Sequence, residues 1–113
     1  MRTIYVDSST KGLIAYVDCA GTSKIVENVH GTNNELEYQA VIYALKQLPE
    51  TYIAKIYSDS LLVVQQLSHR WAIKDADLRK LAVEAWNLID SKHLTVSFDW
   101  IPRESNPAGK LLG

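Results

Sequence analysis

The sequence predicts an α/β domain in which helices flank a five-stranded mixed sheet, with strands 1–3 antiparallel and strands 4 and 5 parallel. The order of patterned segments predicts this fold, because a strand meander followed by alternating helices and strands is typical of a sheet with helices packed on it. A length of 113 residues provides the core of one domain and not of two, so we expect residues 1–113 to form a single domain. Apolar residues make up 47% and charged residues 22%, and this balance excludes a disordered chain.

Three segments rich in β-branched and aromatic residues open the chain. Residues 2–8 and 13–19 flank Lys11-Gly12, so they predict a hairpin. A second turn at 20–22 leads into a third predicted strand over 23–30. Together these segments predict the antiparallel part of the sheet.

The first predicted helix begins after Thr32, because Thr32 followed by Glu35 is a capping-box sequence. Apolar residues then recur at helical spacing until Pro49 marks the end of the helix. This stripe consists of Leu36, Ala40, Val41, Ala44, Leu45 and Leu48. Residues 52–58 predict a fourth strand, which we expect to run parallel to the first through a helical crossover.

Two more helices and one strand complete the predicted fold. Asp59 or Ser60 caps a second helix that runs through about residue 67, and a third helix spans 75–90. Alternating apolar and polar residues predict a fifth strand over 94–100 with one buried face. That face consists of Leu94, Val96, Phe98 and Trp100.

The composition argues against several classes of protein. No apolar run approaches the length of a membrane span, and the apolar stretch before Asp7 is too short for a signal peptide, so we expect no membrane association. The one cysteine, Cys19, cannot form an internal disulfide, which fits a reducing, cytoplasmic location. Because the net charge is −1, a nucleic-acid partner requires metal ions or a local basic patch to offset its phosphates.

Three acids occupy positions where a site on a sheet collects its ligands. Asp7 interrupts an apolar strand, Asp59 closes the fourth strand, and Glu37 lies in the first turn of the first helix on its sheet-facing side. Converging carboxylates repel one another unless divalent cations neutralise them, and Mg²⁺ or Mn²⁺ suits an oxygen-only site. Two such ions about 3.5–4 Å apart activate water and stabilise the leaving oxygen of a phosphodiester. Helix capping is the alternative role of Glu37 and Asp59, and it stays open at this point.

Four segments, in the same order, resemble the motifs of the type 1 ribonuclease H family, most closely its compact prokaryotic and reverse-transcriptase-like branch. The segments are IYVDSS (4–9), GTNNELEYQAVIYAL (31–45), IYSDSLLVVQQL (56–67) and WIPRESNPAGKLLG (100–113). They extend over nearly the whole chain, and the second one is quite specific. The fold of this ribonuclease H-like superfamily agrees with the element order predicted above.

The resemblance implies a metal-dependent endonuclease that hydrolyses the RNA strand of RNA–DNA hybrids with two Mg²⁺ (or Mn²⁺) ions. It assigns metal binding and catalysis to Asp7, Glu37 and Asp59, and substrate binding to Asn33, Asn34, Arg103 and Asn106. The asparagine pair is expected to face the minor groove of the hybrid, where 2′-hydroxyls distinguish RNA from DNA. An RNA–DNA hybrid is therefore the partner that the resemblance implies.

The chain departs from the family's pattern in its last motif. Gly109 stands at the position of the family's fourth carboxylate, so we expect weaker binding of one metal ion and reduced turnover. Glu104 is the only acid within this motif. Because only residues 110–113 follow Gly109, we expect the family's C-terminal helix to be missing.

Two alternatives to an active nuclease stay open. Gly109 and the missing helix also fit a non-catalytic nucleic-acid-binding module on the same fold, which binds a hybrid or double-stranded RNA without cutting it. The chain also fits a fragment or fusion domain of a reverse transcriptase or larger nuclease, whose sheet is covered by a partner.

Overall fold

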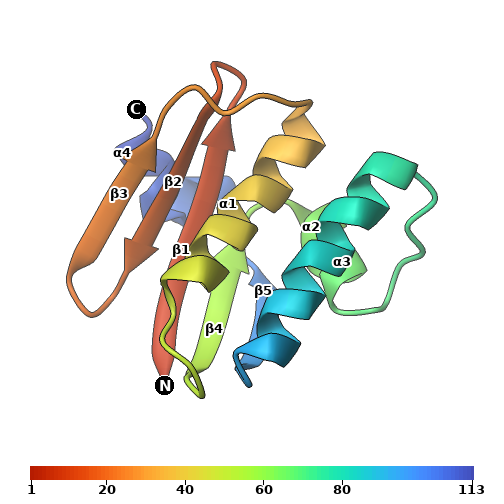
Figure 1. Ribbon diagram of the computed structural model, residues 1–113. Helices are drawn as coiled ribbons and strands as arrows, with labels where there is room; N and C mark the ends of the chain where they lie inside the picture. Colours follow the sequence, from red (N-terminus) through yellow and green to blue (C-terminus); the bar gives the residue numbers. More distant parts are fainter.

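The computed structural model describes residues 1–113 and contains the mixed sheet that the sequence predicts (Figure 1). Its strands are β1 (Arg2–Ser9), β2 (Leu13–Asp18), β3 (Thr22–Val26), β4 (Ile53–Ser58) and β5 (Thr95–Trp100). They lie in the order β3-β2-β1-β4-β5. Strand β2 is antiparallel to β1 and β3, whereas β4 is parallel to β1 and β5. This topology confirms the predicted fold class.

Helices lie on both faces of the sheet. They are α1 (Asn33–Gln47), α2 (Leu61–Leu67), α3 (Ala76–Ser91), the 3₁₀ turn η1 (Arg103–Ser105) and α4 (Pro107–Leu111). Figure 1 shows α1 and α3 side by side in front of the sheet and α4 behind β1 and β2. The main hydrophobic core lies between the sheet and the layer formed by α1 and α3. No helix combines the length and the apolar character needed to cross a membrane.

Helix α1 is fixed at both ends, which sets the position of the side chains it turns toward the sheet. The Thr32 hydroxyl accepts the Glu35 N–H at 3.2 Å and the Glu35 carboxylate accepts the Thr32 N–H at 2.7 Å, so the predicted capping box is confirmed. At the other end, the Lys92 ammonium donates to the Leu45 and Lys46 carbonyls at 3.0 and 3.1 Å. All members of the predicted apolar stripe are buried.

The third strand is shorter than the sequence predicts. It ends at Val26 and not at residue 30, because Asn28 adopts a left-handed backbone with φ +60° that breaks the ladder. The Val29 N–H then donates to the Gly12 carbonyl at 2.9 Å and ties this loop to the β1–β2 turn. A side chain at Gly12 is disfavoured twice, by its φ of +82° and by a Cβ that would lie 2.8 Å from the Val29 carbonyl.

Two expectations for the end of the chain need correction. Trp100 was expected on the buried face of β5, yet it is 49% exposed, because it ends an edge strand that has β4 as its only neighbour. The family's C-terminal helix was expected to be missing, yet residues 107–111 form the short helix α4. Asn106 caps this helix by accepting the Ala108 N–H at 3.0 Å, and Pro107 occupies a first-turn position, where proline is tolerated.

A buried carboxylate at the end of β2 stabilises the pairing of the inner strands β1 and β2. Asp18 accepts the Tyr16 hydroxyl at 2.9 Å and pairs with Arg2 at 3.1 Å. In Asp18→Ala both of these groups, and the Ala20 N–H that donates to Asp18 at 2.8 Å, lose their acceptor, so we expect the free energy of unfolding to fall by about 2–3 kcal/mol. Urea unfolding measures this change. The control Asp99→Ala breaks a solvent-accessible pair with Lys55 and should cost clearly less, and equal losses would contradict the prediction.

Candidate active site

Three acids from three separate elements converge at one edge of the sheet. Asp7 lies near the carboxyl end of β1, Asp59 directly follows β4, and Glu37 projects from α1. Because β1 and β4 are parallel neighbours, their carboxyl ends meet at this edge. One carboxylate oxygen of each acid lies within 4.8 Å of the others. The predicted convergence of the three carboxylates is therefore present in the structure.

Burial and mutual repulsion destabilise the ionised form of these carboxylates when no cation is bound. Asp7 is 3% and Glu37 is 9% exposed. Burial raises the pKa of Glu37 from 4.5 to about 8, with a further contribution from the charge of Asp7. Burial and Asp7 also raise the pKa of Asp59, whereas the Asn106 amide and the Arg103 charge oppose that rise. The positive charge of Arg103 therefore does not balance the three acids when all of them are ionised.

The donor set fits a magnesium or manganese ion. All donors are carboxylate oxygens, which both ions prefer. On an octahedral Mg²⁺ with ligands at about 2.1 Å, neighbouring oxygens lie about 3 Å apart and opposite ones about 4.2 Å apart. The oxygens of Asp7, Glu37 and Asp59 lie within 4.8 Å of one another, so small side-chain movements bring them into this range.

Sequence reasoning missed two serines that contact Glu37. The Ser8 hydroxyl donates to Glu37 Oε1 at 2.7 Å, and the Ser58 hydroxyl donates to Glu37 Oε2 at 3.3 Å. The available signal was that each serine adjoins one of the acids in sequence, Ser8 after Asp7 and Ser58 before Asp59.

Asn106 lies beneath the site and not in its opening. It is fully buried, and its amide donates to the Val6 carbonyl at 2.9 Å and to Asp59 Oδ2 at 3.3 Å. These bonds hold the Asp59 carboxylate against β1. Direct contact between Asn106 and a substrate, which the resemblance implied, does not agree with this burial.

The carboxylates open into a cleft of about 400 Å³. Asn33 and Asn34, at the exposed start of α1, form part of its wall. Arg103 of η1 and Lys11 of the β1–β2 turn also line it and supply positive charge beside the acids. Three of the four residues predicted to bind substrate therefore line the same cleft as the three acids.

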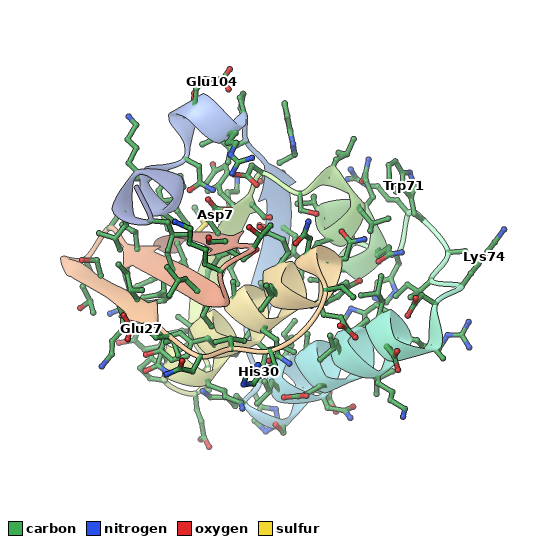
Figure 2. All side chains as sticks on the ribbon, turned by 90° about the horizontal axis from the view of Figure 1, so that it is seen from above. Asp7, Glu27, His30, Trp71, Lys74 and Glu104 are labelled. Atoms are coloured by element: carbon green, nitrogen blue, oxygen red, sulfur yellow. The ribbon has the colours of Figure 1, made fainter.

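Gly109 of α4 directly faces the acidic cluster. A Cβ atom at this position would lie 2.8 Å from Asp7 Oδ2, so a side chain there would point at the carboxylates. Glu104 does not substitute for it, because Figure 2 shows Glu104 at the outer rim, pointing away from Asp7. Trp71 and Lys74 lie farther away, on the connection between α2 and α3 (Figure 2).

The raised pKa of Glu37 predicts a stability that depends on pH when no cation is bound. Its folded-state pKa of about 8 exceeds the ordinary 4.5, so the stabilisation is fully present below about pH 4.5 and is lost as the pH rises through about 8. Each pKa unit corresponds to about 1.4 kcal/mol, so the free energy of unfolding in EDTA should fall by a few kcal/mol between pH 5 and pH 8. Urea unfolding at several pH values measures it.

Glu37→Gln should remove most of this pH dependence, because glutamine does not titrate. Some pH dependence in the same direction should remain, because the pKa of Asp59 is also raised. Glu50→Gln, at an exposed position, is the matched control and should leave the pH dependence unchanged. An equal pH dependence in the Glu37→Gln protein would contradict the prediction.

Comparison with known proteins shows the family to which the chain belongs. The profile of a family described as reverse transcriptase-like matches residues 8–112. The chain is 39% identical to the bifunctional protein Rv2228c of Mycobacterium tuberculosis over 77 residues, which cover 66% of this chain and 21% of that protein. It is 31% identical to the ribonuclease HI of Halobacterium salinarum over 90% of this chain and 57% of that protein. The chain thus spans about a fifth of the first relative's length and somewhat over half of the second's.

Solved structures share the fold. The crystal structure of RNase H1 from H. salinarum matches with a TM-score of 0.82 and 26% identity, over 98% of this chain and 92% of that one. The N-terminal RNase H domain of Rv2228c, solved as a fusion with maltose-binding protein, matches with a TM-score of 0.73 and 31% identity, over 97% of this chain and 88% of that one. LC11-RNase H1, solved in complex with an RNA/DNA hybrid, matches with a TM-score of 0.79 and 22% identity, over 98% of this chain and 93% of that one. Because the family profile matches almost the whole chain and the fold is shared, this chain belongs to the reverse transcriptase-like family and has the ribonuclease H fold.

Proposed function

We propose that this chain is a divalent-cation-dependent endonuclease that hydrolyses the RNA strand of RNA–DNA hybrids. The observation that carries the proposal is the convergence of Asp7, Glu37 and Asp59 within one cleft. The similarity to a ribonuclease HI supports the type of reaction. The hybrid bound to LC11-RNase H1, which shares the fold, supports the substrate.

In this proposal, Asp7, Glu37 and Asp59 hold two Mg²⁺ or Mn²⁺ ions, the number that the family resemblance implies. When bound, the ions supply water activation and neutralise charge on the phosphodiester. Asn106 keeps the Asp59 carboxylate beside β1 through its bonds to Val6 and Asp59. Water is the attacking group, and no side chain acts as a nucleophile.

The walls of the cleft supply groups that suit a hybrid. Arg103 forms no ion pair within the protein, so its guanidinium is available to donate to a phosphate oxygen. The side-chain amides of Asn33 and Asn34 both donate and accept, which suits 2′-hydroxyls and base edges in a minor groove. With a net charge of −1, we expect modest affinity that weakens steeply with added salt.

An end-labelled RNA–DNA hybrid tests the proposal directly. We expect the RNA strand to be cut with Mg²⁺ or Mn²⁺ and to stay intact with EDTA, and we expect a DNA duplex of the same sequence to stay intact throughout. Cutting that persists in EDTA, or equal cutting of the DNA duplex, would overturn the assignment.

Gly109 favours a second candidate function, a module that binds hybrids without cutting them. With no side chain there, the cluster lacks a fourth carboxylate beside Asp7. This candidate predicts a hybrid that is bound but intact in Ca²⁺ and in Mg²⁺ alike. A gel-shift titration in both ions, run on the same samples as the cleavage assay, separates the two functions.

A further inference from the structure

The two serines beside the acids share a position in the sheet. Side chains alternate between the faces of a strand, so Ser8 continues the buried row of Ile4 and Val6 on β1. Ser58 likewise continues the row of Ala54 and Ile56 on β4. Both rows face α1, so each row ends in a hydroxyl at the level where Glu37 approaches the sheet.

The two hydroxyls engage different oxygens of the same carboxylate. Ser8 donates to Oε1 at 2.7 Å and Ser58 donates to Oε2 at 3.3 Å. A carboxylate offers about four lone-pair sites, so one hydrogen bond to each oxygen leaves both oxygens able to bind a cation. The shorter bond to Ser8 is the stronger of the two.

We propose that Ser8 and Ser58 are positioning residues that hold the Glu37 carboxylate in its cation-binding orientation. The inference rests on the proposed function, because it takes Glu37 as a cation ligand. Glu37 reaches the site from a helix on a side chain longer than those of Asp7 and Asp59, so it has the most rotamer freedom to lose on binding. Bonds from two neighbouring strands remove that freedom before a cation arrives, and loss of such outer partners typically costs about 10–100-fold in metal affinity.

Titration of Mn²⁺ alone, followed by its electron paramagnetic resonance signal, tests the inference without any substrate. We expect Ser8→Ala to weaken Mn²⁺ binding about 10-fold and Ser58→Ala, which loses the longer bond, about 3-fold. Ser8→Thr keeps the hydroxyl and should bind Mn²⁺ within about 2-fold of the unaltered protein. Ser97→Ala on β5, at an exposed position without a bond to Glu37, is the matched control and should leave affinity unchanged.

Two further variants separate failure of this inference from failure of the proposed function. Asp7→Asn and Glu37→Gln should abolish Mn²⁺ binding if the acids are its ligands. If they do so while Ser8→Ala and Ser58→Ala bind like the unaltered protein, the positioning role is overturned and the acidic site stands. If the unaltered protein binds no Mn²⁺, both the inference and the cation site are overturned. Far-UV circular dichroism of each variant establishes that the fold is retained.

Discussion

Replacing Asp7 by asparagine is expected to lower hybrid cleavage by at least about 1,000-fold while stabilising the cation-free protein. An amide keeps the shape of the side chain but removes the charge that holds a cation. Losing about 4 kcal/mol of transition-state stabilisation corresponds to this factor. In EDTA above about pH 8, where Glu37 is ionised, the same change removes repulsion with Glu37 and Asp59, so we expect the free energy of unfolding to rise by about 1 kcal/mol. Single-turnover cleavage and urea unfolding measure the two effects.

The opposite signs of these effects distinguish a lost function from a damaged fold. Asp99→Asn, on the edge strand β5 and outside the acidic cluster, is the matched control and should change neither quantity appreciably. Cleavage by the Asp7→Asn protein at the rate of the unaltered protein would contradict the role of Asp7 as a cation ligand. A variant that is both inactive and less stable would show that Asp7 maintains the fold.

Gly109→Asp is expected to raise both Mn²⁺ affinity and hybrid cleavage by about 10-fold, because it adds a ligand oxygen worth about 1.4 kcal/mol. The new Cβ would lie 2.8 Å from Asp7 Oδ2, so the Asp7 carboxylate must shift slightly, as the end of a side chain can. In EDTA above about pH 8, where Glu37 is ionised, a fourth negative charge should lower the free energy of unfolding by about 1 kcal/mol. Manganese titration and cleavage assays on the same preparations measure the gain.

Gly109→Asn is the control for this gain, since asparagine has the same size and makes the same close approach to Asp7 but carries no charge. It should show neither the higher affinity nor the faster cleavage. Equal behaviour of the two variants would contradict the account, because the effect would then come from replacing a helical glycine and not from a ligand.

Most of the fold could be predicted because its elements follow local rules. The capping box at Thr32 and the stripe on α1 are set by neighbours in sequence, and both are confirmed. The end of β3 could not be predicted, because it depends on the left-handed backbone of Asn28 and on a bond to a distant turn. The exposure of Trp100 depends on its place at the sheet's edge, which alternation along one strand does not reveal.

Asp7 could be predicted because a charged residue is out of place in a buried strand, Asp59 because it ends a strand parallel to β1, and Glu37 because helical spacing puts it on the sheet-facing side of α1. The groups around them could not, because their roles come from tertiary contacts. Asn106 bonds to Val6 across a separation of 100 residues, and this contact moves it from the expected substrate surface into the core. Ser8 and Ser58 gain a role only when α1 brings Glu37 between them. The cytoplasmic location and the single-domain organisation stay predictions.

Single-turnover cleavage of a hybrid labelled on its RNA strand, with protein in excess and Mn²⁺ present, tests the proposed nuclease activity directly. We expect cuts within the RNA strand, an intact DNA strand and no cuts by the Asp7→Asn protein under the same conditions. A hybrid that is bound by the protein yet remains intact in Mn²⁺ would contradict the account and assign the cleft to binding alone.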